Sequence, residues 1–197
     1  MLAESECMRN DVPQRLISTH KSVTNGHQRC AAAGEGQPTI RIAQPDEAPA
    51  IVELTNAIFR EKTSPSLASF TNARDVEQLM HQGTFLLAEK EKEIVGYAYL
   101  KPRLEASRLE LLAVAPMLQR AGIGSQLLQA AERLSSSMHC LFMHLSVMNL
   151  HLETLRFCRR RGYIEFGIES LNINQPVSLN CHLVRMCKRL HEDCVAF

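Results

Sequence analysis

The sequence lacks paired cysteines. Its seven cysteines are odd in number and scattered, and no two of them form a CxxC pair. This pattern argues against a disulfide framework and against a zinc site, and it fits a reducing compartment such as the cytosol. An excess of charge of one sign is also lacking, because 22 Lys and Arg stand against 21 Asp and Glu and the formal net charge is +1. Without a global field to hold a polyanion or a membrane surface, we expect neither nucleic acid nor a membrane as a partner.

Long apolar runs are absent as well. The longest reach only about ten residues, whereas a helix that spans a bilayer needs about 20. The N-terminus has no apolar h-region of a secretory signal, so we expect a cytoplasmic protein. What remains is a chain of 197 residues with 45% apolar and 22% charged side chains, which is typical of one soluble globular domain.

Residues 1–37 show no sustained apolar period of either 2 or 3.6, and we expect a disordered N-terminal extension. A mitochondrial presequence is the alternative. Such segments are poor in acidic residues, whereas this one contains four, Glu4, Glu6, Asp11 and Glu35. The folded domain is expected over residues 38–190, and residues 191–197 form a short C-terminal tail.

Hydrophobic periodicity within the expected domain predicts alternating strands and helices. Short apolar or alternating runs predict strands around Ile40 and at 85–88, 94–100, 109–115, 141–147, 163–168 and 177–186. Apolar residues at spacings of 3 and 4 predict helices from Pro45 through Ile58, around 76–80, and at 122–136 and 153–161. The order β-α-α-β-β-β-α-β-α-β-β predicts an α/β fold (an α+β mixed sheet) in which an antiparallel meander feeds a βαβ unit.

The segment most informative about chemistry is residues 109–132, LELLAVAPMLQRAGIGSQLLQAAE. A buried strand stops at Pro116, a turn holds Gln119, Gly122 and Gly124, and an amphipathic helix follows at once. The first N–H groups of a helix have no intrahelical partner, the helix dipole adds partial positive charge, and glycines let a phosphate approach the backbone. The segment predicts a pyrophosphate site, although glycines at a tight turn are also ordinary structural punctuation.

Two other phosphate-binding motifs share this chemistry and do not fit. A dinucleotide-binding Rossmann unit needs a third glycine, but the residues after Gly124 are Ser125, Gln126 and Leu127. A P-loop needs GKS or GKT, and no lysine follows Gly124.

A third phosphate-binding pattern matches this segment better. It is Q/RxxGxG/A, placed after a strand of the form LxVxP and before a helix. With Gln119, Arg120, Gly122 and Gly124 at its fixed positions, the segment resembles the pyrophosphate loop of the GNAT superfamily of N-acetyltransferases. A second segment, LSVMNLHLETLRFCRRRGYIEFG at 145–167, is similar to the next strand and helix of that family. The element order over residues 39–190 also matches, so the resemblance implies a GNAT-like fold for everything except the N-terminal extension.

The resemblance implies acetyl-CoA as co-substrate, in a cleft where two parallel strands splay apart. The pantetheine arm would pair with the strand edge at Leu112, Ala113 and Val114. The pyrophosphate would be held by backbone N–H groups of residues 119–125, with charge from Arg120 and a hydroxyl from Ser125. These loop residues are Gln119, Arg120, Ala121, Gly122, Ile123, Gly124 and Ser125. Asn149 matches an asparagine near the pantetheine arm, and a loop or helix-cap role is the equal alternative.

Acetyl transfer to an amine needs a neutral amine, a polarised carbonyl and a proton for the departing thiolate. Glu110, two residues before Leu112, is the leading candidate for the base that deprotonates the amine, and a solvated strand-start residue is the alternative. His144 and His151 are the other candidates, and a structural role is the favoured interpretation of each. The family often has a tyrosine as acid after the phenylalanine of its helix, but here Cys158 follows Phe157 and joins the expected cofactor-binding residues. A small buried cysteine is the favoured interpretation, which leaves the acid unassigned.

Arginines also crowd this helix, at Arg156, Arg159, Arg160 and Arg161. A solvated face is the usual explanation, and an arginine close to the cofactor, meeting a phosphate or an acidic acceptor, is the other.

We therefore expect an N-acetyltransferase that acts on a primary amine of a small molecule by direct attack in a ternary complex. The alternative is a degenerate GNAT module that binds acyl-CoA as a sensor or assembly component. The acceptor pocket is expected between the first two helices, the loop 61–71 and the final hairpin. The identity of the acceptor, the acyl length and the choice between monomer and homodimer stay open.

Overall fold

The structure, a computed structural model, describes residues 36–61, 72–170 and 181–190. All of them belong to one compact unit that covers residues 33–197. The expected N-terminal extension, apart from Gly36 and Gln37, and the expected tail 191–197 lie outside the described residues, as does most of the loop 61–71.

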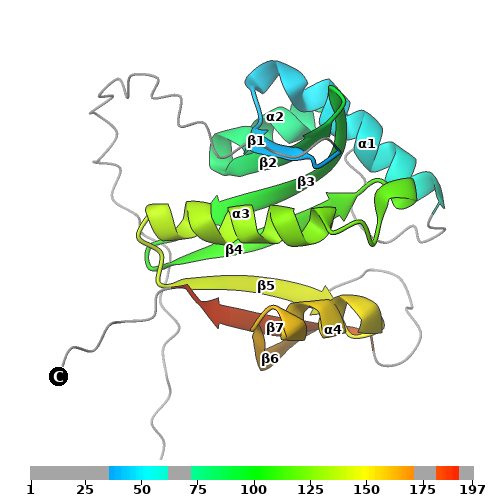
Figure 1. The fold of residues 1–197 in the computed structure, drawn as a ribbon. Helices are drawn as coiled ribbons and strands as arrows, with labels where there is room; N and C mark the ends of the chain where they lie inside the picture. Colours follow the sequence, from blue (N-terminus) through cyan, green and yellow to red (C-terminus); the bar gives the residue numbers. More distant parts are fainter. Residues whose placement is uncertain (1–35, 62–71, 171–180, 191–197) are drawn as a thin grey trace, which may run out of the picture. The chain divides into compact units, whose positions relative to one another are not determined.

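A seven-stranded mixed sheet with the order β1-β2-β3-β4-β5-β7-β6 forms the centre of the unit (Figure 1). Its strands are β1 (Thr39–Ile42), β2 (Thr84–Lys90), β3 (Glu93–Pro102), β4 (Ala106–Val114), β5 (Phe142–Met148), β6 (Ile164–Ser170) and β7 (His182–Arg189). Every neighbouring pair is antiparallel except β4 and β5, which run parallel. The predicted mixed sheet and the predicted order of elements are confirmed.

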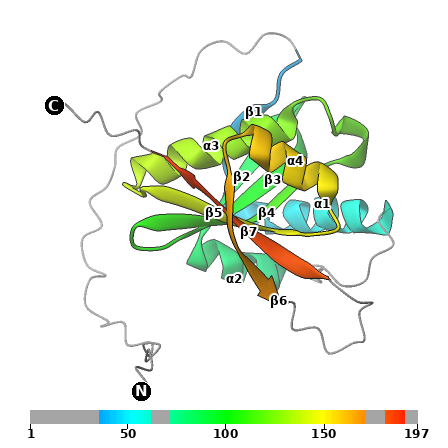
Figure 2. The ribbon, with the colours of Figure 1, turned by 90° about the horizontal axis from the view of Figure 1, so that it is seen from below.

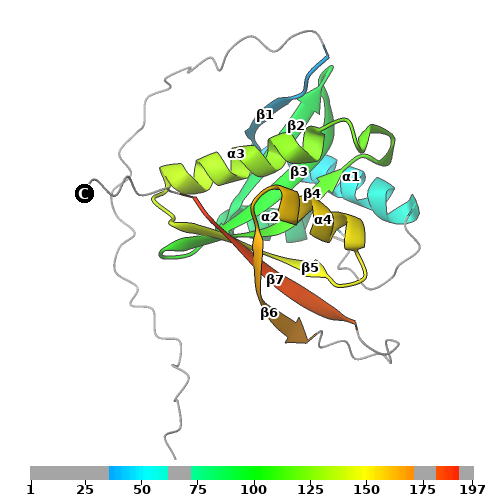
Figure 3. The same ribbon diagram turned by 60° about the horizontal axis from the view of Figure 1, so that its bottom comes forward.

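Helices cover both faces of this sheet (Figure 2). They are α1 (Ala48–Glu61), α2 (Ala73–Gln82), α3 (Ile123–Ser137) and α4 (Leu152–Arg160), with short 3-10 turns η1 (Pro45–Glu47) and η2 (Pro116–Leu118). Figure 3 shows α3 and α4 side by side on the same face. Leu127 and Leu128 of α3 and Leu155 of α4 pack there in one apolar cluster, while α1 and α2 pack on the other face against Phe85, Tyr97 and Tyr99.

Glu110 is an extra residue in β4. Tyr99 of β3 pairs with Leu111, and the next residue, Leu100, pairs with Leu109, so Glu110 has no partner and forms a β-bulge. The bulge reverses the alternation of side chains: Leu109 and Leu112 both pack in the cluster with α3, whereas Leu111 and Ala113 pack with α1 and α2. A strictly alternating strand would place Leu109 and Leu111 on the same face.

The parallel pairing of β4 with β5 is short. Its ladder runs from Ala106 opposite Phe142 to Leu109 opposite Leu145 and ends where the bulge begins. Beyond this point β4 continues to Val114 and β5 to Met148, and Figure 1 shows the two strands diverging toward their C-terminal ends. The bulge and the divergence thus occur at the same place.

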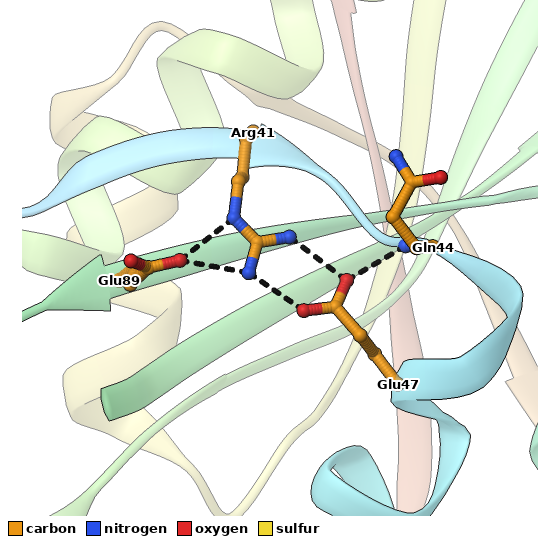
Figure 4. Close-up of polar contacts among 4 residues, drawn as sticks. All are labelled: Arg41, Gln44, Glu47 and Glu89. Atoms are coloured by element: carbon orange, nitrogen blue, oxygen red, sulfur yellow. Dashed lines mark hydrogen bonds and ion pairs between the residues drawn. The ribbon is translucent and has the colours of Figure 1, made fainter. Parts of the chain in front are cut away.

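A charged cluster ties the edge strand β1 to its surroundings (Figure 4). Arg41 donates from Nε to Glu89 of β2 (2.7 Å) and from Nη1 and Nη2 to both carboxylate oxygens of Glu47 (2.8 and 2.6 Å). The backbone N–H of Gln44 donates to the same Glu47 carboxylate at 2.7 Å. Arg41 is the first cause of the lowered pKa of Glu47, and these bonds fix the turn from β1 into η1.

Element boundaries differ from the predicted ones mainly at two strands. β4 begins three residues before the predicted Leu109, and β7 runs to Arg189, beyond the predicted end at residue 186. The end of β7 could not be predicted from the apolar pattern because Arg185 and Lys188 interrupt it. Val184 and Met186 still point into the core. The predicted start of that strand, 177–180, lies outside the described residues.

Candidate functional site

A cleft of about 340 Å³ opens where β4 and β5 diverge. One wall is β4 from Leu109 to Val114, and the other is β5 from Leu145 to Met148. Phe157 and Cys158 of α4 and Leu128 of α3 contribute apolar side chains from one face of the sheet, and Tyr97 lines the cleft from β3. The cleft is mostly apolar, with polar groups confined to a few positions such as Glu110 and Ser146, as is usual for small-molecule sites.

The β4 edge that faces the cleft exposes backbone groups in alternation. The Ala115 N–H donates to the Val95 carbonyl of β3 (2.8 Å). Because N–H and C=O of one trans peptide point in opposite directions, the Val114 carbonyl points away from β3, toward the cleft. Alternation gives Leu112 the same direction and turns the backbone groups of Ala113 toward β3. The Gln119 side chain donates to the Val114 carbonyl (3.2 Å), so this group already has a partner.

The turn from β4 into α3 presents free N–H groups over a narrower range than residues 119–125. The Gln119 N–H donates to Pro116 (3.2 Å), and the Ser125 N–H donates to Gly122 (3.0 Å). Ile123 and Gly124 precede the first bonded turn of the helix, so the general rule for helix starts leaves their N–H groups to outside partners. Arg120 has a φ of 67° and Gly122 a φ of 85°. These left-handed backbone conformations form a tight turn before α3.

Gly122 and Gly124 serve different needs. Gly122 has a left-handed backbone, which glycine adopts without strain. Gly124 has ordinary helical backbone, and a Cβ added there would meet only the Val114 side chain, at 3.8 Å. The fold itself therefore does not require glycine at 124. A bare backbone at this helix start is what close approach of a phosphate requires.

One arginine of the cluster, at the C-terminal end of α4, reaches the start of α3. Arg161 donates to the Ser125 hydroxyl and lies over the Phe157 ring, 5.8 Å from its centroid. Arg156 instead pairs with Glu153 at 3.4 Å, and Arg159 pairs with Glu165. Of the two explanations offered for the arginine cluster, solvated face and cofactor contact, the second has geometric support at Arg161 alone.

Glu110 lies in the cleft wall at the bulge, with an exposed carboxylate. Its charge contributes, after burial, to raising the pKa of Tyr99 on the neighbouring strand. Two further hydroxyls lie nearby, and sequence reasoning did not single them out. Tyr97 is buried with its hydroxyl 2.9 Å from Thr55, and Ser146 projects from β5 within 3.5 Å of Arg108. Only the spacing of polar residues within apolar strands could have indicated them.

Cys158 lines the cleft and is 3% exposed. Burial raises the pKa of its thiol to about 11. A thiol of that pKa is a weaker acid than an ordinary cysteine thiol, whose reference pKa is about 8.5. Transfer of its proton to such a thiolate is therefore unfavourable, because the acceptor has the lower pKa. This environment supports the interpretation of Cys158 as a small core residue.

The remaining predicted residues fall in different places. Asn149 accepts the His182 N–H through Oδ1 (3.1 Å) and donates its own N–H to the His182 carbonyl (2.9 Å), so it extends the pairing of β5 with β7. His151 lines the cleft at the start of α4. His144 lies outside the cleft, in a second, smaller cavity on β5.

Within residues 36–61, 72–170 and 181–190, no group of three His, Cys, Asp or Glu side chains comes together as a metal site. Within the same ranges, no helix is both long and apolar enough to cross a membrane.

Comparison with solved structures places the fold among acetyltransferases. Ard1 from Thermoplasma volcanium superposes with a TM-score of 0.66 at 19% identity, covering 79% of this chain and 99% of that chain. The ribosomal-protein-S18-alanine N-acetyltransferase from Escherichia coli gives 0.66 at 14% identity, with 81% and 99% covered. A GNAT family acetyltransferase from Elizabethkingia anophelis, with acetyl-CoA bound, gives 0.62 at 20% identity, with 78% and 98% covered. At these identities the likeness shows the fold alone.

Sequence comparison gives the family. No curated protein sequence matches the chain. The family described as acetyltransferase (GNAT) matches residues 49–163, from the start of α1 to the end of the turn after α4. This range is more than half of the chain and contains the cleft wall of β4, the turn into α3 and the cysteine of α4, so the chain belongs to the acetyltransferase (GNAT) family.

Proposed function

We propose that the protein is an acetyl-CoA-dependent N-acetyltransferase that acts on a primary amine of a small molecule, by direct attack in a ternary complex. The observation that carries the proposal is the cleft between the diverging strands β4 and β5. The turn that contains Gln119 and the glycine-containing start of α3 lie next to this cleft. A long, narrow ligand with an anionic group at one end and a reactive group at the other fits this arrangement.

The chain's own groups suit the binding of acyl-CoA. The N–H groups of residues 120–124 and the α3 dipole favour a pyrophosphate, and Arg161 adds positive charge beside Ser125. The cleft-facing backbone of Leu112 and Val114 suits pairing with an amide-containing arm, which would take the place of the Gln119 side chain on the Val114 carbonyl. When bound, acetyl-CoA supplies the activated acetyl group. The acyl length stays open.

Glu110 is the group we assign to proton removal from the amine. Glu110 is the bulge residue of β4, at the point where β4 and β5 separate, and it lines the cleft wall. An ammonium ion is not nucleophilic, so a carboxylate that accepts its proton, directly or through one water, lets the amine attack the thioester carbonyl. The proton donor for the departing thiolate stays unassigned.

A degenerate module that binds acyl-CoA without efficient turnover is the second candidate. The observation in its favour is the buried thiol of Cys158, with its raised pKa, at the position where the family often has a tyrosine.

Thermal unfolding with and without acetyl-CoA tests the premise that both candidates share. Ligand at about 100 times its dissociation constant should stabilise the protein by about 2.7 kcal/mol, and a melting temperature unchanged at millimolar acetyl-CoA would rule out both.

Release of free CoA thiol over a panel of primary amines then separates the candidates. Turnover on any amine supports the enzyme. Tight binding of acetyl-CoA without thiol release on the whole panel would favour the module.

A further inference from the structure

A second cavity, of about 80 Å³, lies on the sheet face opposite α3 and α4. Its charged lining consists of three arginines from three elements: Arg103 after β3, Arg108 of β4 and Arg185 of β7. The other lining residues are Ala106, Ser107, His144, Leu145, Ser146 and Phe166. The volume is several times what one water requires and is sufficient for a carboxylate or phosphate group.

The strand register explains how these side chains meet. Arg108 is the pairing partner of His144 in the parallel ladder, and Arg185 is the partner of Ser146 in the ladder between β5 and β7. Met143, Leu145 and Val147 of β5 point to the core with α3, so His144 and Ser146, which alternate with them, point to the opposite face. α1 and α2 pack over β2 to β4 on that face, and the apolar cluster beneath them includes no residue of β5, β6 or β7.

Two of the arginines have side-chain contacts that hold them in place, and the three charges are only partly neutralised. The Arg185 guanidinium lies over the Phe166 ring (4.6 Å from Cζ to the centroid), and His144 packs on the same ring, 5.2 Å between centroids. Arg108 donates to Ser146 at 3.5 Å. Among the residues that the structure describes, Glu169 is the one carboxylate within ion-pair distance of the three arginines, 3.8 Å from Arg108. Three guanidinium charges against one carboxylate leave a cationic pocket.

This pocket adjoins the cleft between β4 and β5. Leu145 and Ser146 line both cavities. Glu110, the bulge residue, follows Arg108 by two residues on β4, so their Cα atoms are at most about 7 Å apart. An amine held at Glu110 could therefore carry an anionic group that reaches the arginines a few bonds away.

We propose that the pocket of Arg103, Arg108 and Arg185 binds a carboxylate or phosphate group of the amine acceptor, and that the enzyme thereby selects acidic primary amines. The selectivity for acceptors rests on the proposed acetyltransferase function, whereas the anion site itself does not. Guanidinium groups bind both anions through paired N–H donors, which explains why the pocket uses arginine rather than lysine.

His144 offers a readout of anion binding that is independent of catalysis. Burial lowers its pKa first, and the charges of Arg185, Arg108 and Arg103 lower it further. Further ionisable groups near it include Glu169, 3.8 Å from Arg108, and Cys187, the pairing partner of His144 on β7. An anion bound among the arginines favours the protonated imidazole and should raise the pKa of His144.

The first experiment follows the His144 resonances by NMR during a pH titration of the full chain, with and without inorganic phosphate or succinate. We expect each anion to raise the pKa of His144 in the wild type and in the control variant R133Q, which removes an exposed arginine of α3. The double variant R108Q/R185Q should show no such rise, with its melting temperature as the check on folding. A wild-type titration unmoved by both anions would overturn the proposal, and so would a rise that survives in the double variant.

The second experiment measures acetylation of matched acceptors. γ-Aminobutyrate is compared with its amide, and ethanolamine phosphate with ethanolamine, so the two pairs distinguish carboxylate from phosphate. We expect kcat/KM to favour an anionic member by about tenfold or more, R108Q or R185Q to remove that preference, and the control R133Q to keep it. Equal rates within both pairs would refute acidic selectivity. No acetylation of any amine, with the His144 response intact, would refute the acetyltransferase function and leave the anion site standing.

Discussion

Glu110 combines two properties at one residue: it is the extra residue of the bulge and a carboxylate in the cleft wall. Its assigned role predicts a specific pH behaviour. At pH 7 the variant E110Q should lower kcat by about 100-fold, the scale of a single general base, with little change in acetyl-CoA binding. The deficit should shrink as the pH approaches the pKa of the amine, because the acceptor then loses its proton without help.

Steady-state kinetics from pH 7 to 10 measure this effect. E105Q, which changes an exposed glutamate between β3 and β4, is the matched control. A kcat of E110Q equal to that of the wild type at every pH would remove Glu110 from proton transfer.

Gly124 and Gly122 should respond to alanine in opposite ways. G124A should raise the free energy of unfolding by up to about 1 kcal/mol, because the added methyl fits beside Val114 and alanine favours a helix. The same methyl should weaken acetyl-CoA binding by about tenfold or more, since it occupies the approach to the N–H groups.

G122A should instead lower the free energy of unfolding by about 1 to 2 kcal/mol, because alanine is strained at a φ of 85°.

Chemical denaturation and calorimetric titration of the same preparations check both effects. A G124A protein that binds acetyl-CoA like the wild type would contradict the placement of the pyrophosphate at this helix start.

At the scale of elements, the end of α4 and the start of α3 meet through Arg161 and Ser125. The variant R161Q should raise the dissociation constant of acetyl-CoA by about tenfold, because a charged hydrogen bond to phosphate is lost, and should weaken the salt dependence of binding. R160Q, at the adjacent exposed position, is the control and should bind like the wild type. Titration calorimetry at two salt concentrations gives the answer, and equal losses in both variants would point to general electrostatics.

The free edge of β4 predicts an alternating pattern of amide protection. On addition of acetyl-CoA, hydrogen exchange at the Leu112 and Val114 amides should slow, because these groups face the cleft. Exchange at Ala113 should change little, because its backbone faces β3 in the antiparallel ladder. Exchange measured by NMR distinguishes this pattern from uniform slowing of all three amides, which would indicate general rigidification without pairing at the edge.

For the whole molecule, the Arg41 cluster links global stability to pH. The pKa of Glu47 is lowered in the folded protein, so folding favours its ionised form. Its contribution is present above the ordinary pKa of 4.5 and is lost as the pH falls through the lower pKa of the folded state. E47Q should lower the free energy of unfolding by about 1 to 2 kcal/mol at pH 7, and this difference should shrink below about pH 4.5.

Urea unfolding at pH 7 and at pH 3.5 measures the difference. E53Q, an exposed position on α1, is the control and should stay close to the wild type at both pH values. A difference for E47Q that stays constant with pH would contradict the linkage.

The sequence was sufficient to predict the order of the elements and the turn into α3, because periodicity and glycine placement are local signals. It was insufficient for features that depend on the register between strands. The bulge at Glu110, the four-pair ladder of β4 and β5 and the meeting of Arg103, Arg108 and Arg185 become visible only when strands are paired. The Asn149 side chain illustrates the same limit, because its partner His182 is 33 residues away.

The single unpaired residue of β4 has a consequence for how the cleft is encoded. Substitution of Glu110 changes only a side chain, whereas we expect its deletion to remove the register shift between β4 and β3 and to extend the ladder of β4 with β5. The opening between the two strands therefore depends on the number of residues in β4 as well as on their types. We expect a strand shortened by this residue to narrow the cleft even with every other site residue present.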